Sequence, residues 1–166
     1  MKRWVVMFFS VMVMVGWSVP SGAASPASTE GHGGAGTVQD AVAVIVNPLN
    51  PIRSLSMEQL RGIFSHKLSA WHLLGGNHEL SVRALIGPEE STVLQTFRQR
   101  VLMQEPFEGC ETFKGDEEVL KGVGRDEAAV GIVSLSSLGD QRGIRVIAVD
   151  AEKADLNNPD YPLLVP

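Results

Sequence analysis

The chain has 166 residues, of which 44% are hydrophobic and 20% are charged, and its formal net charge is −5 at pH 7. These values are typical of one globular domain with a real core, and the length is short for two domains. An acidic surface argues against nucleic acid or an anionic membrane as a partner, so any anion site must be built locally.

Residues 1–24 have the pattern of a secretory signal peptide. Lys2 and Arg3 precede an almost wholly apolar run at 4–17, and small residues follow at 21–24. A retained membrane anchor is the alternative, but the apolar run is shorter than the ~20 residues that span a bilayer. We therefore expect cleavage and export, in a bacterium to the periplasm.

The folded domain is expected to occupy residues 38–166, after a flexible linker at 25–37 that is rich in Ser, Ala and Gly. Residues 41–46 form an uninterrupted apolar run with β-branched side chains, which predicts a central strand covered on both faces. The two Pro and two Asn residues of 47–51 then predict a turn.

A short helix is predicted next, over Met57–Phe64, because Ser56 and Gln59 have the spacing of a capping box. Residues 65–77 are expected to form a loop, and the apolar run at 80–86 a second strand. A helix that begins at Pro88 or Ser91 and runs to Met103 should follow it.

The second half of the chain continues the alternation of strands and helices. Residues 105–115 are expected to be irregular, and a helix should begin at Asp116. The remaining predictions are a third strand at 128–133, broken by Gly131, a helical turn at 134–138, a fourth strand at 144–149 and a polar tail at 150–166. This order predicts an α/β domain with a mostly parallel or mixed sheet and helices on its faces.

The segment from Gly87 to Val93 connects a predicted strand to a predicted helix, and such a turn can bind an anion through unpaired amides and the helix dipole. The hydroxyls of Ser91 and Thr92 either donate to an oxyanion or cap the helix. Glu89 and Glu90 either change the specificity towards a cation or an amine, or are acids at the helix start with Pro88 in the first position.

No other pattern indicates catalysis, a metal or a cofactor. His66, His72 and His78 are spaced by six residues, which gives no shared helical face, so solvated histidines are favoured over a metal site. Cys110 is the only cysteine and is either buried and inert or available for intermolecular pairing, and its neighbours Glu108 and Glu111 disfavour a thiolate. We expect no enzymatic activity, because no hydrolase elbow, P-loop or paired-Cys motif is present.

Several stretches together resemble the phosphate-binding protein of bacterial phosphate ABC transporters and its wider periplasmic-binding-protein-like (PBP-like) family. Their order and rough spacing match across about residues 42–163, and the segment from 55 to 71 is the most specific. The matching stretches are 46–51, 55–65 with Lys67 and Trp71, Gly75 and Gly76, Ser91 with Thr96 and Phe97, 129–133, and 161–163.

The resemblance implies a single lobe of a type II PBP-like fold, with a mixed sheet and helices on both faces, where family members usually have two lobes that close around the anion. The family's loop has an Arg, three further residues, and then Ser-Gly-Thr opening a helix that reaches a Phe. Alignment on Phe97 puts Ser91 on the Ser, Thr92 on the Gly, Val93 on the Thr and Gly87 on the Arg. The bidentate cation is therefore replaced by a residue without a side chain.

Two functions follow from the residues and the resemblance. The first is an exported solute-binding-like protein that binds phosphate or another small oxyanion weakly, through Ser91, Thr92 and the amides from Glu90 to Val93. The second is a ligand-free periplasmic interaction or accessory module that keeps the fold. Its partner would be a membrane or periplasmic protein, or a second copy of the chain.

Overall fold

The computed structural model describes residues 40–77, 79–140 and 142–165. The predicted signal peptide and linker lie outside these residues. Within them, no helix combines the length and the apolar character that a membrane span requires.

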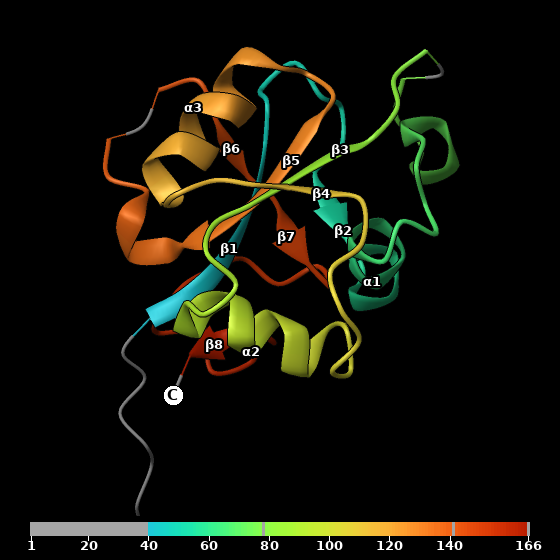
Figure 1. The fold of residues 1–166 in the computed structure, drawn as a ribbon. Coiled ribbons are helices and arrows are strands. Elements are labelled where there is room, and N and C mark those ends of the chain that lie inside the picture. The colour runs from blue at the N-terminus through green and yellow to red at the C-terminus, as the bar shows by residue number, and fades with distance from the viewer. Residues whose placement is uncertain (1–39, 78, 141, 166) are drawn as a thin grey trace, which may run out of the picture. The chain divides into compact units, whose positions relative to one another are not determined.

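Short strands alternate with helices along the described chain (Figure 1). In order, the elements are β1 (Asp40–Val46), β2 (Ser54–Leu55), α1 (Met57–Phe64), the 3₁₀ helix η1 (Trp71–Leu74), β3 (Arg83–Ile86), α2 (Thr92–Arg100), β4 (Cys110–Thr112), α3 (Asp116–Arg125), β5 (Ala129–Ser134), the 3₁₀ helix η2 (Leu135–Ser137), β6 (Arg145–Val146), β7 (Ala148–Val149) and β8 (Leu164–Val165).

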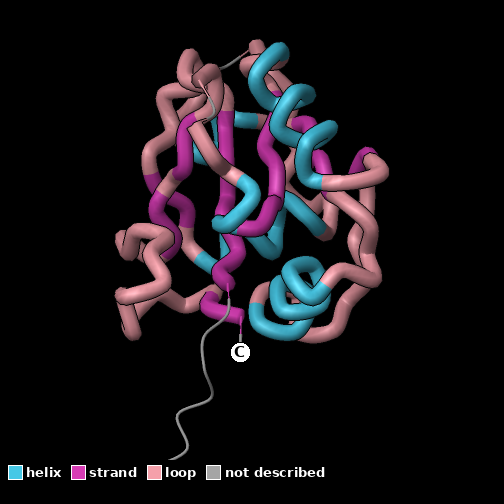
Figure 2. The backbone as a smooth tube through the Cα atoms, turned by 90° about the vertical axis from the view of Figure 1, so that its left-hand side faces the viewer, coloured by secondary structure: helices cyan, strands magenta, loops and turns pink. Residues whose placement is uncertain are grey.

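The main sheet is mixed and has the strand order β4-β3-β5-β1-β6, with β8 paired to the start of β1. Strands β3, β4 and β5 run parallel to one another, whereas β1 is antiparallel to β5, β6 and β8. Strands β2 and β7 form a separate parallel pair. The prediction of a mixed sheet is confirmed, and Figure 2 shows these strands with helices and loops around them.

Strand β1 is central and covered on both faces, as its apolar run predicts. Val44 and Val46 belong to a core that includes Leu94 and Phe97 of α2. Ile45 points to the opposite face, into a second core formed mainly with α3. Because successive side chains of a strand alternate between faces, a strand buried on both faces must be apolar at every position.

Two helices begin where the sequence predicts. The side chain of Ser56 accepts a hydrogen bond from the amide of Gln59, and the side chain of Gln59 accepts one from the amide of Ser56, so the capping box of α1 is complete. Helix α3 begins at Asp116 with three acids in its first turn, where they complement the helix dipole.

The turn at 47–51 also anchors α3. The side-chain amide of Asn47 donates to the carbonyl of Val123 at 3.0 Å and to that of Gly124 at 3.1 Å. The side-chain amide of Asn50 donates to the carbonyl of Glu127 at 3.1 Å. The bonds from Asn47 go to carbonyls in the last turn of α3, where acceptors lack a full set of intrahelical donors, and the bond from Asn50 goes to a carbonyl just after the helix.

Three predictions in the middle of the chain are wrong in part. The strand predicted at 80–86 begins only at Arg83, and a 3₁₀ helix lies within the loop predicted at 65–77. Strand β4 lies in the segment predicted to be irregular. It is the edge strand, and Glu111 and Thr112 are exposed, so it has none of the apolar signal of a buried strand.

The single strand predicted at 144–149 is divided at Ile147. The amide of Ile147 donates to the carbonyl of Val44 in β1, whereas the next amide, that of Ala148, donates to the carbonyl of Arg53 before β2. The segment therefore moves from one sheet to the other between consecutive residues, which an apolar run cannot reveal.

The prediction of a polar tail at 150–166 is wrong, because its end is part of the fold. Tyr161, Leu163 and Val165 are buried, and β8 pairs with the start of β1 (Figure 2). The hydroxyl of Tyr161 donates to the carbonyl of Val42 at 2.6 Å. Every second side chain from Tyr161 to Val165 is buried, which is the two-residue periodicity of an extended chain with one buried face.

Gly131 does not break β5, although the sequence suggested that it would. A methyl group at this position would lie 2.8 Å from Cγ1 of Val119 and 2.9 Å from Cγ2 of Val123. The glycine therefore lets α3 pack closely against the middle of the sheet.

We expect Gly131→Ala to lower the free energy of unfolding by about 1–3 kcal/mol, the range for overpacking a tight core. Urea denaturation followed by circular dichroism measures this. Gly115→Ser is the matched control, because a Cβ there meets nothing within 4 Å and serine suits the N-cap of α3. A Gly131→Ala chain as stable as the parent would contradict this account of the packing.

Candidate functional site

The turn from Gly87 to Val93 connects the end of β3 to the start of α2. Gly87 is buried directly after β3, and the chain then turns so that the amide of Ser91 donates to the carbonyl of Pro88 at 3.0 Å. The turn thus lies outside the carboxyl end of a sheet strand, where ligands bind in α/β folds.

Ser91 is the N-cap of α2. Its hydroxyl oxygen accepts a hydrogen bond from the amide of Leu94 at 3.3 Å, and its carbonyl accepts the first intrahelical bond, from Gln95, at 2.9 Å. The amides of Thr92 and Val93 precede these bonds, at the positions where a helix has no internal acceptor. The capping interpretation of Ser91 is confirmed. Its hydroxyl oxygen accepts the capping bond, and its hydroxyl proton can still donate a hydrogen bond to another acceptor.

Thr92 is the first residue of α2 and its side chain is exposed, whereas Val93 is half-buried against the core. The helix does not begin at Pro88, and no acid lies in its first turn. The interpretation of Glu89 and Glu90 as acids of the first helical turn is therefore wrong. Both precede the N-cap on the exposed part of the turn.

The cations around this turn are few and already engaged. Arg83 donates to Glu111 at 2.6 Å and also pairs with Asp126, so its guanidinium is held at the far end of β3. This guanidinium is therefore not available to a ligand at the Gly87 turn. Nη1 of Arg98 lies 4.0 Å from a carboxylate oxygen of Glu89, and both side chains are partly exposed, so this pair is weak.

Asp116 is close to the turn, which the sequence alone did not indicate. A Cβ built on Gly87 would lie 3.5 Å from Oδ1 of Asp116. The other carboxylate oxygen, Oδ2, accepts a hydrogen bond from the amide of Ser134 at 2.8 Å. Gly87, which the resemblance aligns with the family arginine, therefore faces a carboxylate.

Asp40, Ser134 and Ser136 form a second polar group on the same edge of the fold. The hydroxyl of Ser134 donates to Asp40, the hydroxyl of Ser136 donates to it at 3.0 Å, and the amide of Ser136 does so at 3.2 Å. Burial alone would raise the pKa of Asp40, but the hydrogen bonds from Ser134, Ala41 and Ser136 outweigh it and lower the pKa below its usual value. Spacing could not reveal this group, because its members come from opposite ends of the domain.

The histidines do not form a site in the described residues. His66 and His72 are both exposed, His66 beside Gly109 and His72 in η1, and His78 lies outside the description. Across residues 40–77, 79–140 and 142–165, no three His, Cys, Asp or Glu side chains are arranged to hold a metal ion.

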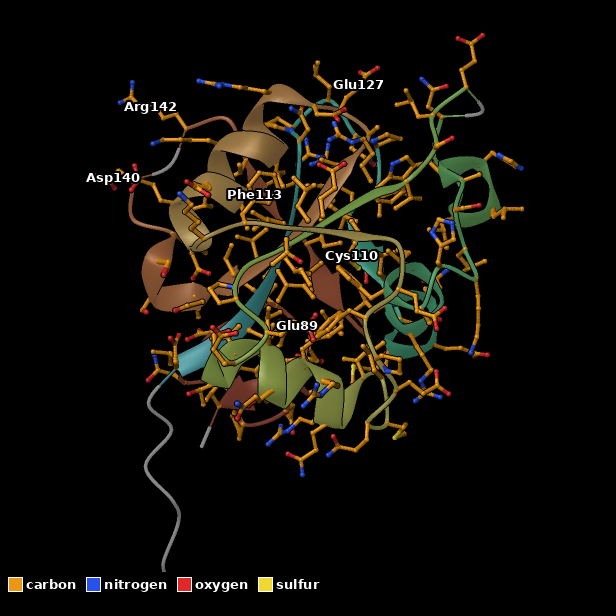
Figure 3. The ribbon with its side chains drawn as sticks, viewed as in Figure 1. Glu89, Cys110, Phe113, Glu127, Asp140 and Arg142 are labelled. Atoms are coloured by element: carbon orange, nitrogen blue, oxygen red, sulfur yellow. The ribbon has the colours of Figure 1, made fainter. Side chains whose placement is uncertain are left out.

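Cys110 is half-buried in β4, with its thiol directed towards the carbonyls of Phe64 and Glu108. Burial raises the pKa of the thiol to about 12, and the negative charge of Glu89 adds to the rise. The sequence attributed a disfavoured thiolate to Glu108 and Glu111. The charge that acts is that of Glu89, and Figure 3 shows both labelled residues on the face of the molecule turned towards the viewer.

Comparison with known proteins decides the family. A model of the PBP superfamily domain matches residues 21–164. The chain belongs to the PBP superfamily. It is 28% identical to the phosphate-binding protein PstS of Bacillus subtilis (strain 168) over 126 residues, which are 74% of this chain and 41% of that protein. It is 26% identical to the protein SphX of Synechococcus elongatus over 117 residues, 66% of this chain and 35% of that protein.

Solved structures show the same fold. A putative phosphate ABC transporter substrate-binding protein from Clostridium perfringens, with bound phosphate, superposes with a TM-score of 0.67 at 24% identity over 75% of this chain and 52% of that one. PstS from Borrelia burgdorferi does so with a TM-score of 0.65 at 16% identity over 75% and 54%. The predicted family and the predicted single lobe of a type II PBP-like fold are confirmed.

This chain spans about half of these structures and less than half of the curated relatives. The Bacillus subtilis relative and the Clostridium perfringens structure are both named as binding proteins, which is consistent with the expectation of no enzymatic activity.

The reactivity of the Cys110 thiol reports how closely the carboxylate of Glu89 approaches it. We expect Cys110 to react slowly with iodoacetamide at pH 8, since little thiolate is present, and Glu89→Gln to speed the reaction by removing a nearby negative charge. Alkylation rates measured by mass spectrometry report this. Glu90→Gln is the control, and an equal acceleration by both substitutions would contradict a specific approach of Glu89 to the thiol.

Proposed function

We propose that this chain is an exported solute-binding-like protein related to the phosphate-binding proteins of ABC transporters, and that its β3–α2 turn binds phosphate or a similar oxyanion weakly. Family membership and the names of the relatives support the solute-binding part.

The apolar run at 4–17 after Lys2 and Arg3 supports export through a signal peptide at 1–24, with a linker at 25–37 and the domain at 38–166. The intact mass of the protein recovered from the periplasm tests the cleavage.

The observation that carries the anion site is the N-cap at Ser91. It orients the amides of Thr92 and Val93 away from the helix body, towards the space in front of the turn, together with the positive end of the α2 dipole. The hydroxyls of Ser91 and Thr92 supply further donors. The amide of Glu90 lies beside them on the same turn.

Binding at this turn is weak because the nearby charges oppose it. Gly87 offers no cation, Asp116 faces the position where one would lie, and Glu89 and Glu90 are on the turn itself. Two like charges ~4 Å apart repel by about 1 kcal/mol in bulk water and by about 4 kcal/mol near a protein surface. This repulsion offsets much of the binding free energy that hydrogen bonds from a few neutral donors supply.

Isothermal titration of the full chain with phosphate and sulfate tests the proposal. We expect saturable heat with a dissociation constant in the millimolar range, since about 4 kcal/mol of binding free energy corresponds to ~1 mM. Ser91→Asn and Ser91→Asp both keep an N-cap acceptor, so stability should change little, but only the aspartate adds a negative charge. The aspartate variant should lose binding and the asparagine variant should keep part of it. A folded protein without heat at millimolar ligand would refute the anion site.

Gly87→Arg should tighten phosphate binding at least tenfold, because a charge-assisted hydrogen bond is worth about 1.5–3 kcal/mol. A Cβ at this position makes only ordinary contacts, at 3.5 Å to Asp116 and 4.0 Å to Gly115, so the backbone accepts a side chain. Gly87→Gln is the neutral control. Equal affinities in the two variants would mean that the missing cation does not limit binding.

The ligand-free interaction module is the second candidate, and the carboxylates of Glu89, Glu90 and Asp116 around the turn favour it. Its partner would be a membrane or periplasmic protein or a second copy of the chain. It predicts no anion heat from the parent chain and unchanged partner crosslinking in a Glu89→Gln, Glu90→Gln double variant. Saturable phosphate binding that Ser91→Asp removes would refute it.

A further inference from the structure

A cavity of about 460 Å³ lies beside β6 and β7, and no residue of the 87–93 turn contributes to it. Its volume is within the range of small-molecule sites, roughly 300–1,000 Å³. Its wall is formed by four apolar residues and three cationic ones. The lining residues are Val146, Ile147, Ala148 and Ala154, with Arg53, Arg145 and Lys153.

Within the part of the chain that the structure describes, no carboxylate forms an ion pair with any of these three cations. The guanidinium of Arg145 donates to the carbonyl of Asn50 at 2.7 Å and to that of Pro48, and both acceptors are uncharged. Among the described residues, the ion pairs involve other side chains and include neither Arg53 nor Lys153. Arg83, by contrast, is held between two carboxylates.

This arrangement is unusual in a chain with a net charge of −5. Like charges gathered at one cavity repel one another, and a bound anion would relieve that repulsion. The bonds from Arg145 to two carbonyls also hold its guanidinium in place, so little side-chain entropy remains to be lost on binding.

A tight turn holds the third cation at the cavity. Asp150 and Ala151 both have positive φ, at 50° and 69°, and neither is glycine. Val149 and Glu152 exchange two backbone hydrogen bonds of 2.9 Å across them, so the chain reverses and brings Lys153 and Ala154 back against β6 and β7.

The turn is fixed to α1 as well. The amide of Met57 donates to the carboxylate of Asp150 at 3.1 Å, and the amide of Asp150 donates to the carbonyl of Leu55 at 3.0 Å. Positive φ at both central residues is what a two-residue hairpin turn of type I′ requires, and these two bonds hold that turn in place beside the cavity.

We propose that this cavity binds a small organic anion, a molecule with a carboxylate or phosphate head and an apolar body. The head pairs with Arg53, Arg145 and Lys153, and the body lies on Val146, Ala148 and Ala154. The site uses none of the residues proposed for the oxyanion and is independent of that function.

Octanoate is a suitable probe, because it joins a carboxylate to a short apolar chain and stays monomeric at millimolar concentration. In a titration of the ¹⁵N-labelled full chain, we expect saturable amide shifts concentrated at residues 145–148 and 153–154. Octyltrimethylammonium has the same apolar chain with the opposite charge and should cause no such shifts.

Two pairs of substitutions separate this site from general electrostatic attraction. Arg53→Gln with Lys153→Gln should raise the dissociation constant for octanoate at least tenfold. Lys114→Gln with Arg125→Gln removes the same charge from exposed positions that do not line the cavity, and should change it less than twofold. Ala154→Leu, which fills part of the cavity, should weaken octanoate while leaving the weak heat of inorganic phosphate unchanged.

Equal loss in both double variants, or shifts of similar size with octyltrimethylammonium, would overturn the proposal. A peptide of alternating glutamate and leucine that shifts the amides of residues 145–148 and 153–154, while octanoate does not, would overturn it in favour of an acidic protein partner. Ser91→Asp and Gly87→Arg should leave octanoate binding unchanged, so failure of the oxyanion site and failure of this one are distinguishable.

Discussion

Burial of β1 on both faces is the constraint on which the rest of the domain depends. Six consecutive residues, from Ala41 to Val46, have no measurable exposure. Each buried Val or Ile side chain contributes about 1.5–3 kcal/mol relative to exposure, so this strand is a large part of the favourable free energy of folding. Its partners come from the whole chain: β5 and β6 on either side, β8 at its start, and α3 tied to its end through Asn47.

That arrangement also explains where the polar groups gather. The edge at which β3 ends and β1 begins carries the β3–α2 turn, Asp116 and the hydrogen-bonded group of Asp40 with two serines. This edge keeps donors suited to an oxyanion at the start of α2. It also carries more negative than positive charge, which is why we propose weak binding there. Three cations, Arg53, Arg145 and Lys153, line instead the cavity beside β6 and β7.

The sequence predicted accurately the bounds of those elements whose pattern is complete within neighbouring residues. The apolar run of β1, the capping box of α1 and the acids at the start of α3 each predict their element within about a residue. The errors lie where partners far along the chain decide the structure. Edge strand β4 is exposed. Strands β6 and β7 divide at Ile147 because Ile147 donates to β1 and Ala148 donates to Arg53, the residue before β2. Strand β8 forms because it pairs with the first two residues of β1.

At the candidate site the same division holds. The sequence by itself indicated the family and the turn from Gly87 to Val93, with Ser91 as a candidate cap of the helix that follows, because a motif and a helix cap are encoded in neighbouring residues. Only the tertiary structure decided the charge that surrounds the turn. Asp116 faces Gly87, Arg83 is committed to Glu111 and Asp126, and Arg53, Arg145 and Lys153 meet at one cavity. Electrostatic interactions depend on distance in space, and no spacing along a chain fixes that distance for residues this far apart.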